Sequence, residues 1–176
     1  KALENYSDAV RNVEMLFQNT LDEIFKNLDC SVNYLKLADV ANDFGRGKSK
    51  HRPRNDERLY GDSIPFVQTG SITAASMYLS HFDKFYSEFG VNQSKVWKRG
   101  TVCLTIAANI AELAILETDA CFPDSVIGIQ PNLQITTSEY LYFVLLFFQK
   151  QLKNKSKGAA QQNINLGTFE TERFPF

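Results

Sequence analysis

The chain has few of the residues that metal centres and disulfide-bonded scaffolds need. Its 176 residues include only three cysteines, Cys30, Cys103 and Cys121, and only two histidines, His51 and His81. Three cysteines without a CxxC pair form neither a disulfide framework nor a zinc site of the usual spacing. Neither histidine has carboxylates or cysteines at a spacing that suits a metal. We therefore predict no metal site, and reduced cysteines in or near the core.

A long apolar run is also missing. The longest, "YLYFVLLFF" from Tyr140 to Phe148, has nine residues, whereas a helix that spans a membrane needs about 20. The chain opens with "KALENYSDAV", which contains neither an initiator Met nor an apolar signal region. We expect a cytoplasmic protein without membrane contact, and a chain that is a fragment or one piece of a longer protein.

Catalytic motifs are the third absence. The sequence contains no GxGxxG, GxxxxGK[ST], GxSxG or HExxH. It has no Asn-Pro and no Pro-Pro, which excludes the Asn-Pro-Pro-aromatic motif of an adenine methyltransferase. Asp124, in "CFPDSVIG", resembles a nuclease carboxylate only superficially, because no ExK follows it, and we assign it a structural or turn role. We predict no catalytic residue in this chain.

What the chain does contain begins with a long amphipathic helix, predicted over Ala2 to Leu28. Its apolar residues recur at a spacing of three and four, which is typical of a coiled-coil or bundle seam. Such a seam needs a partner helix outside this chain, or in a segment beyond Phe176; the alternative is a helix packed on its own domain. The seam consists of Leu3, Tyr6, Val10, Val13, Phe17, Leu21, Ile24 and Leu28.

After Leu28 the pattern changes to short apolar runs separated by turn residues. The strand-like runs are "SIPFVQTGSI", "GTVCLTI", "AELAILET", "DSVIGIQP" and "NINLGTFETERFPF", and we expect a tight connection near Asn109. Only one other long helix is predicted, from Ser138 to about Lys155. The predicted fold class is α+β: a coiled-coil-type helix over residues 1–28, then a globular mixed α/β domain rich in short strands over residues 29–176, with the boundary at Asp29 to Asn33.

A basic segment, "FGRGKSKHRPR", is the first candidate site. From Arg46 to Arg58 it carries six Lys or Arg and two acids, a net +4 in a chain whose net charge is −1. In an extended backbone its alternating cations would share one face, at roughly 6.6 Å per pair of residues, and glycines would let backbone N–H groups approach phosphates. A solvated surface loop is the alternative. The candidate DNA-binding residues here are Arg46, Lys48, Ser49, Lys50, His51, Arg52 and Arg54.

Two further polar segments contain side chains that hydrogen-bond base edges or phosphates. In "QTGSI", at the predicted end of a strand, the candidates are Gln68, Thr69 and Ser71. In "KNKSKGAAQQNIN", after the second long helix, they are Gln161, Gln162 and Asn163. The lysines that precede them are expected at a helix C-terminus from the helix dipole alone.

Three segments, taken in order, resemble one known family. They are "GRGKSKHRPRNDERLYGDSIPFVQTGSI", "RGTVCLTIAANIAELAILETDACFPDSVIGI" and "KGAAQQNINLGTFETERFPF". Together they look like a target recognition domain of the specificity (S) subunit of type I restriction-modification enzymes. The helix ending in "LFQNTLDEIFKN" is similar to the central spacer helix of that subunit. The resemblance covers nearly all of the chain.

The resemblance implies a function in a larger complex. In this family the S subunit carries two recognition domains, each reading one half of a split target in double-stranded DNA, held apart by two antiparallel spacer helices. It has no catalytic site of its own. Modification (M) subunits use S-adenosylmethionine to methylate adenine, and restriction (R) subunits use ATP, with Mg²⁺, to translocate and cut DNA. We therefore expect no cofactor in this chain.

Three blocks carry the resemblance residue by residue. Gly45 to Arg54 matches the family's glycine-bearing loop, Tyr60 to Ile72 its "ipfv..gdi" block, and Gly158 to Asn165 its "g..q.ni" block. The chain departs from the family at Asn109 to Leu113, where many members have glycine for a turn. It also stops where the second spacer helix would follow, so we expect a possible homodimer through the first helix. The alternatives are a protein-protein adaptor that uses the helix and basic loop, and, less favoured, a small nuclease.

Overall fold

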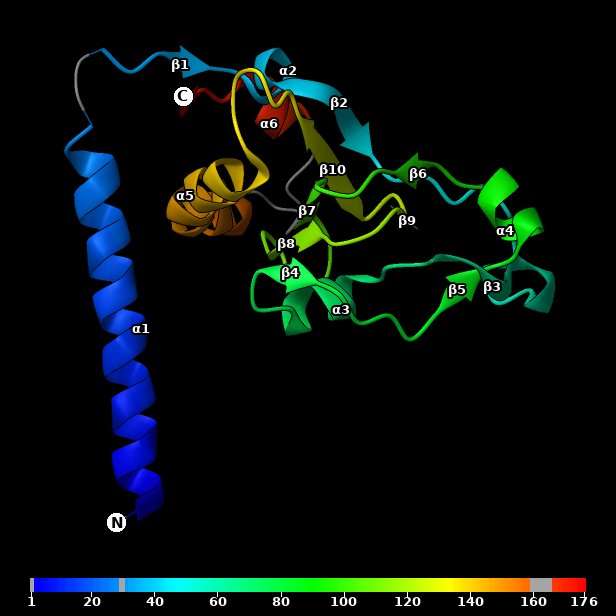
Figure 1. The fold of residues 1–176 in the computed structure, drawn as a ribbon, viewed down its shortest axis with the longest axis horizontal. Coiled ribbons are helices and arrows are strands. Elements are labelled where there is room, and N and C mark those ends of the chain that lie inside the picture. The colour runs from blue at the N-terminus through cyan, green and yellow to red at the C-terminus, as the bar shows by residue number, and fades with distance from the viewer. Residues whose placement is uncertain (1, 29–30, 159–165) are drawn as a thin grey trace. The chain divides into compact units, whose positions relative to one another are not determined.

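The structure is a computed structural model, and it describes residues 2–28, 31–158 and 166–176 (Figure 1). The chain divides into two compact units, residues 1–33 and residues 34–176. The first unit contains α1 (Ala2–Lys26), the long blue helix in Figure 1. The second contains the other elements. The predicted fold class, a long N-terminal helix followed by a mixed α/β domain of many short strands, is confirmed.

Most of the predicted seam residues of α1 are exposed. Tyr6 and Val13 are about two-thirds or more exposed, at 71% and 67%, and Val10, Phe17 and Ile24 are exposed as well. Leu21 is buried and Leu28 half-buried, whereas the side chain of Leu3 lies outside the described residues. Met15 and Leu16, which the three-four spacing did not include, are also exposed. The apolar surface of α1 is therefore broader than the predicted stripe.

The second unit is built from short elements around one sheet. Its helices are α2 (Leu37–Val40), η1 (Glu57–Leu59), α3 (Thr69–Ala74), α4 (Glu88–Asn92), α5 (Ser138–Gly158) and α6 (Leu166–Thr171). Its strands are β1 (Tyr34–Leu35), β2 (Ala41–Arg46), β3 (Tyr60–Pro65), β4 (Tyr78–Leu79), β5 (Phe85–Tyr86), β6 (Val96–Trp97), β7 (Val102–Thr105), β8 (Leu113–Leu116), β9 (Ala120–Cys121), β10 (Val126–Pro131) and β11 (Phe174–Pro175).

Five strands form the main sheet in the order β2-β10-β7-β8-β4. Neighbours are antiparallel except β4, which runs parallel to β8. Every residue of β7 and β8 is buried, and because strand side chains alternate between faces, both faces of the sheet must be covered. Helix α5 contacts β7, β8 and β10, and α3 contacts β7 and β8. Three two-stranded sheets, β1-β11, β3-β5 and β6-β9, complete the unit.

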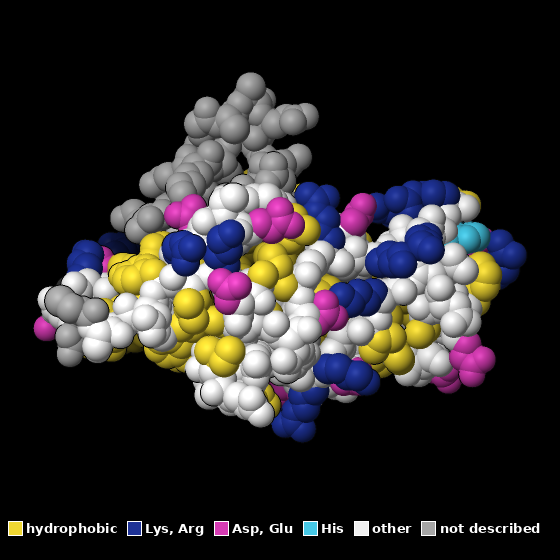
Figure 2. Space-filling view, turned by 90° about the horizontal axis from the view of Figure 1, so that it is seen from above, with side chains coloured by type: hydrophobic (Ala, Val, Ile, Leu, Met, Phe, Trp, Pro, Cys, Tyr) yellow, Lys and Arg dark blue, Asp and Glu magenta, His cyan; other side chains and the backbone are white. Residues whose placement is uncertain are grey.

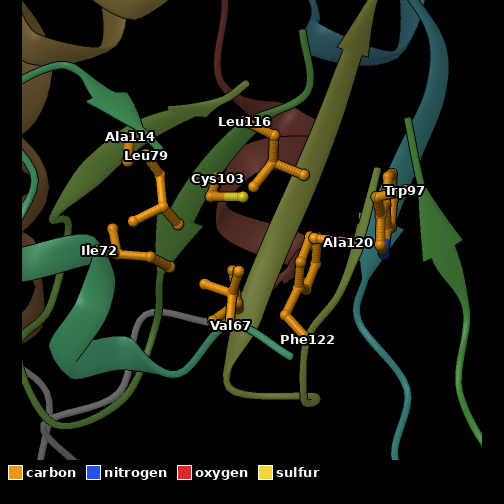
Figure 3. Packing of buried hydrophobic residues seen from close by; sticks show 10 residues of the cluster. Val67, Ile72, Leu79, Trp97, Cys103, Ala114, Leu116, Ala120 and Phe122 are labelled. Atoms are coloured by element: carbon orange, nitrogen blue, oxygen red, sulfur yellow. The ribbon is translucent and has the colours of Figure 1, made fainter. Parts of the chain in front are cut away.

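The α3 side of the sheet carries an apolar core (Figure 3). Cys103 of β7 and Leu116 of β8 pack there with Ile72 of α3, and Trp97 stacks on Phe122 with ring centroids 5.2 Å apart. Burial raises the pKa of the Cys103 thiol well above its ordinary value, so this cysteine stays protonated. Cys103 and Cys121 are both free and buried, as predicted, whereas Cys30 lies outside the described residues.

A second, smaller core lies where β3 pairs with β5. It consists of Leu59, Phe66, Tyr86 and Cys121, with Phe66 and Tyr86 stacked at a centroid distance of 4.1 Å. This core anchors η1 and α4, because Leu59 belongs to η1 and Gly90 of α4 lies against it. The smaller core therefore fixes η1, which follows the basic loop, and α4.

The connection between β7 and β8 runs over residues 106–112, which include Asn109, and it forms without glycine. Val102 pairs with Ile115 and Leu104 with Leu113. Ala108 and Ala111 adopt positive φ values of 61° and 63°, a left-handed conformation that costs an L-residue roughly 1–2 kcal/mol. The Thr105 side chain accepts the Glu112 N–H at 2.9 Å and donates to the Asn109 carbonyl. These bonds stabilise a turn that contains no glycine.

Two secondary-structure expectations were wrong. The run "NINLGTFETERFPF" was expected to form a strand, but among its described residues 166–171 form α6, and Phe174–Pro175 form β11, which pairs with β1. The run "SIPFVQTGSI" ends as α3 rather than as a strand. Helices of four to six residues are shorter than two turns, so they show no 3.6-residue repeat in sequence. Buried Ile72 and Phe169 hold these two helices through tertiary packing.

Among the described residues, no helix is both long and apolar enough to cross a membrane.

Candidate nucleic-acid interface

The basic loop begins where β2 ends at Arg46 and is held by backbone bonds on two sides. The N–H of Gly47 donates to the Val126 carbonyl at 2.8 Å, and the N–H of Lys48 to the Phe122 carbonyl at 3.0 Å. On the other side, the N–H of Lys50 donates to the Gln93 carbonyl at 3.1 Å. The side chain of Ser94 donates to the Lys48 carbonyl at 2.6 Å, and Ser49 forms an isolated β-bridge with Ser94.

These bonds change the interpretation of the loop's glycines. A Cβ on Gly47 would lie 2.3 Å from the Phe122 carbonyl oxygen and 2.4 Å from that of Pro123, so only glycine fits there. The N–H groups of Gly47 and Lys48 are already bonded to carbonyls, so the expectation that they cradle phosphates is wrong. Gly47 serves close packing instead, and any phosphate contact falls to the side chains.

The expectation of a single extended face is also wrong. The backbone is extended through Ser49, but residues 52–55 bend and turn, so the cations after Lys50 leave the line of the strand. Arg52 folds back, and its Nη1 donates to the carbonyls of Ser49 and His51 at 2.7 and 2.8 Å. Arg54 pairs with Asp124, with 3.0 Å between Nη2 and Oδ1. Asp124 itself lies in the turn between β9 and β10, as the predicted turn role requires.

His51 and Arg58 meet at one carboxylate. Oδ2 of Asp56 lies 2.7 Å from His51 Nε2 and 2.7 Å from Arg58 Nη2. Oδ1 accepts the backbone N–H of Arg58 at 3.0 Å and caps η1. The Arg58 guanidinium, followed by the His51 ring, holds the pKa of the Asp56 carboxyl well below its ordinary value. Asp56 is therefore ionised at neutral pH and organises the second half of the loop.

Three cations of the basic loop remain available to contact an anionic ligand. Arg46, Lys48 and Lys50 are exposed, and within the described part of the chain no carboxylate lies within ion-pair distance of them. Figure 2 shows several Lys and Arg side chains close together toward the right end of the face in view. An anionic ligand at this surface would meet charges that no internal acid neutralises.

The second candidate group lies at the start of α3. Gln68 is exposed and occupies the N-cap position, with no side-chain cap bond, whereas Thr69 and Ser71 are half-buried inside the helix. The expectation of a strand end there was wrong by a few residues, because β3 already ends at Pro65. Gln161, Gln162 and Asn163 lie outside the described residues.

Two adjacent residues, Cys121 and Phe122, hold the segment that leads into Gln68 and the basic loop. Phe66 forms a β-bridge with Cys121, and the N–H of Val67 donates to the Cys121 carbonyl at 2.8 Å. The next residue, Phe122, accepts the N–H of Lys48. The basic loop and the segment that leads into Gln68 are therefore attached to adjacent residues, although 20 positions separate Lys48 from Gln68 in sequence.

Two contributors were missed from sequence. The sequence prediction included Asp56 only as a negative charge in the basic segment. An acid two residues before an Arg and five after a His can, however, accept hydrogen bonds from both side chains. Phe89, on α4, is exposed beside His51 and Arg58, with the His51 ring 5.2 Å and the Arg58 guanidinium carbon 5.3 Å from its centroid. No local signal relates position 89 to position 58. In the described residues, no group of His, Cys, Asp or Glu side chains is arranged to hold a metal ion.

Comparison with solved structures supports the fold. The HsdS subunit from Thermoanaerobacter tengcongensis matches with a TM-score of 0.72 at 16% identity, over 99% of this chain and 41% of that one. A chain from a structural study of complex assembly and conformational transition of the type I R-M system matches with a TM-score of 0.76 at 16% identity, over 99% and 42%. The type I restriction-modification S subunit from M. genitalium matches with a TM-score of 0.58 at 14% identity, over 98% and 41%.

This chain thus spans about two fifths of the length of those three. The model of one protein family, the type I restriction modification DNA specificity domain, matches residues 31–176. That match includes the basic loop, the segment leading into α3 and the whole main sheet. The chain therefore belongs to the family of type I restriction modification DNA specificity domains.

Proposed function

We propose that this chain acts in the specificity subunit of a type I restriction-modification system, where it reads one half of a bipartite target in double-stranded DNA. The observation that carries the proposal is the family match over residues 31–176. The chain's own chemistry agrees with it, because a surface of unpaired cations suits a DNA backbone and the folded domain supplies exposed polar side chains close to it.

In this proposal, one set of residues binds the DNA backbone and another set reads the bases. Arg46, Lys48 and Lys50 grip phosphates, which adds affinity for any sequence. Gln68, and outside the described residues Gln161, Gln162 and Asn163, read base edges, at roughly 1–3 kcal/mol for each good contact. Arg52 and His51 shape the loop through their internal bonds, and Arg54 contributes fully only when Asp124 releases it.

The chemistry of modification and cleavage lies with partner subunits in this proposal. M subunits use S-adenosylmethionine, R subunits use ATP and Mg²⁺, and this chain directs them to a site without catalysing a step. Because these steps act on the cell's own DNA and on incoming DNA, the proposal places the complex in the cytoplasm.

Residues 1–28 are proposed to be a spacer helix, and residues 29–176 the recognition domain. Tyr6, Val10 and Val13 are exposed along α1, and apolar side chains in this pattern are suited to packing against a second helix. That helix is a second spacer or the α1 of another copy of this chain.

A binding selection tests the proposal. A pool of duplexes with randomised central positions is incubated with the chain, alone and together with M subunits, and the bound duplexes are sequenced. The complex should enrich a short defined sequence, and methylation of an adenine should then depend on that sequence. An adaptor would enrich no sequence in either condition, and cleavage of DNA by the chain alone in Mg²⁺ would favour the nuclease alternative. Either outcome would count against the proposal.

A further inference from the structure

We infer that Phe89 makes an apolar contact to the bases of the bound duplex, so that this side chain contributes to the choice of sequence while the free cations contribute affinity alone. The inference rests on the proposed function and deepens it by naming a specificity-determining residue. It starts from a side chain that the fold leaves exposed.

Phe89 is an exception among the phenylalanines of its unit. Its side chain is 37% exposed. The other phenylalanines in the described part of residues 34–176 are buried or half-buried. A phenyl ring is stabilised by roughly 1.5–3 kcal/mol when it is fully buried. The ring of Phe89 forgoes part of that gain, which an apolar ligand surface would supply.

The backbone that presents the ring is fixed. Ser87 caps α4 by accepting the Gly90 N–H at 3.2 Å, and its hydroxyl donates to the Arg58 carbonyl at 2.5 Å. The N–H of Ser87 donates to the Leu59 carbonyl at 2.9 Å. A Cβ on Gly90 would lie 2.2 Å from the same Leu59 oxygen, so α4 packs directly on η1. Phe89 is therefore held between two residues that are tied to the basic segment.

Two side chains of the basic segment lie against the ring. The Arg58 guanidinium lies over it at 5.3 Å, and the His51 ring meets it edge-on at 5.2 Å. The backbone carbonyl of Gln93, the C-cap residue of α4, accepts the N–H of Lys50 at 3.1 Å. The exposed ring thus lies beside His51 and Arg58, on a helix whose C-terminal end is bonded to the middle of the basic loop.

This combination of groups fits a duplex. Unpaired lysines meet phosphates, whereas an apolar ring gains from contact with a thymine methyl group or an exposed base step. Arg58 adds little to phosphate binding, because Asp56 already takes its guanidinium through Nε and Nη2. Its role at this surface is to hold the ring. A contact to bases differs between sequences, whereas a contact to phosphate does not.

The test compares specific with non-specific binding. The complete chain with M subunits is prepared as wild type, Phe89→Ala, Phe89→Tyr and Leu133→Ala, and each is measured against the selected duplex and a shuffled duplex. Phe89→Ala should reduce the ratio of the two affinities by roughly tenfold, and Phe89→Tyr, which keeps the ring, should restore most of it. Leu133 is 73% exposed on the loop between β10 and α5, so Leu133→Ala should leave the ratio unchanged.

An unchanged ratio in Phe89→Ala would overturn the inference. So would an equal loss of affinity for both duplexes, since that would assign the ring to loop stability or backbone binding. If Phe89→Ala does not fold, as judged by its circular dichroism and thermal midpoint, Phe89→Gln takes its place with the same two expectations. Failure of the proposed function looks different, because then the wild-type complex itself would prefer no duplex.

Discussion

Arg54 Nη2 lies 3.0 Å from Asp124 Oδ1, and this ion pair joins the basic loop to the turn after β9, 70 residues later. Both side chains are about half exposed. The pair therefore contributes little to stability, on the order of 0–1 kcal/mol. Its larger effect is on charge, because Asp124 partly neutralises one cation of the loop and places a carboxylate beside the surface proposed to meet DNA.

Replacing Asp124 should strengthen DNA binding. Asp124→Asn frees Arg54 and removes a negative charge, so affinity for any duplex should rise, and log K should depend more steeply on log salt by up to about 0.9. Fluorescence anisotropy at a series of salt concentrations measures both. Glu170→Gln, which makes the same change of charge on the exposed face of α6, is the control for net charge. If the two variants had equal effects, the change would follow from net charge alone, and Asp124 would not lie near the bound DNA.

Removing the free cations should have the opposite effect. Lys48→Ala with Lys50→Ala should weaken binding to specific and non-specific duplexes alike, and flatten the salt dependence by up to about 0.9 per lost phosphate contact. Lys98→Ala is the matched control, because Lys98 Nζ is already paired with Asp119 at 2.9 Å. A salt slope that stays at the wild-type value would place the DNA on another surface.

Alanine substitutions at Gly47 and Gly45 should differ in their effect on the free energy of unfolding. Gly47→Ala would press a methyl group into the carbonyl oxygens of Phe122 and Pro123, and overpacking of this kind costs roughly 1–3 kcal/mol. A Cβ on Gly45 would meet no atom within 4 Å, so Gly45→Ala should be neutral or slightly stabilising. Urea unfolding of the two variants checks the prediction, which requires a lower midpoint for Gly47→Ala alone.

Asp56 should make stability depend on pH in acid. Arg58 and His51 lower the pKa of Asp56 in the folded state, so the ionised carboxylate contributes stability above the unfolded pKa of about 3.9. That contribution is lost as pH falls from there toward the lower folded pKa. The free energy of unfolding should therefore fall less steeply below about pH 4 in Asp56→Asn than in wild type. Parallel curves for the two proteins would contradict this assignment.

The exposed face of α1 should drive self-association when no other spacer helix is present. Val13→Asp places a charge on the exposed apolar surface of this helix, where Val13 is 67% exposed. In sedimentation at tens of micromolar, wild type should be dimeric and Val13→Asp monomeric, because apolar burial contributes roughly 25 cal/mol per Å². Asn12→Asp, a neighbouring polar position on the helix, is the control. A monomeric wild type would remove the homodimer from the proposal.

The basic loop shows where local sequence stops being informative. Its charge excess and its alternation were plain in "GRGKSKHRPR", but the path of the backbone was not. Phe122 and Gln93 fix that path through bonds to Lys48 and Lys50, and both lie more than 40 residues away in sequence. The alternation predicted five equivalent cations, whereas these distant bonds and the turn at 52–55 leave three available.

The turn near Asn109 shows the reverse case. Strand-like runs of β-branched and apolar residues on either side correctly predicted β7 and β8, because both strands are buried on both faces and cannot accept polar side chains. The absence of glycine made the turn look doubtful. The side chain of Thr105, which bonds Asn109 and Glu112, holds the alanines in their left-handed conformation.

By itself, the sequence determined the long elements and the chemistry available to the chain. Periodicity over many residues specified α1, a capping signal before a long apolar run specified α5, and shorter apolar runs specified the central strands. Tertiary structure alone decided the short helices, the role of Gly47, which cations are neutralised, and the position of Phe89 beside His51 and Arg58. The physical reason is range: periodicity and propensity act between near neighbours, whereas packing, ion pairing and exposure depend on residues that only folding brings together.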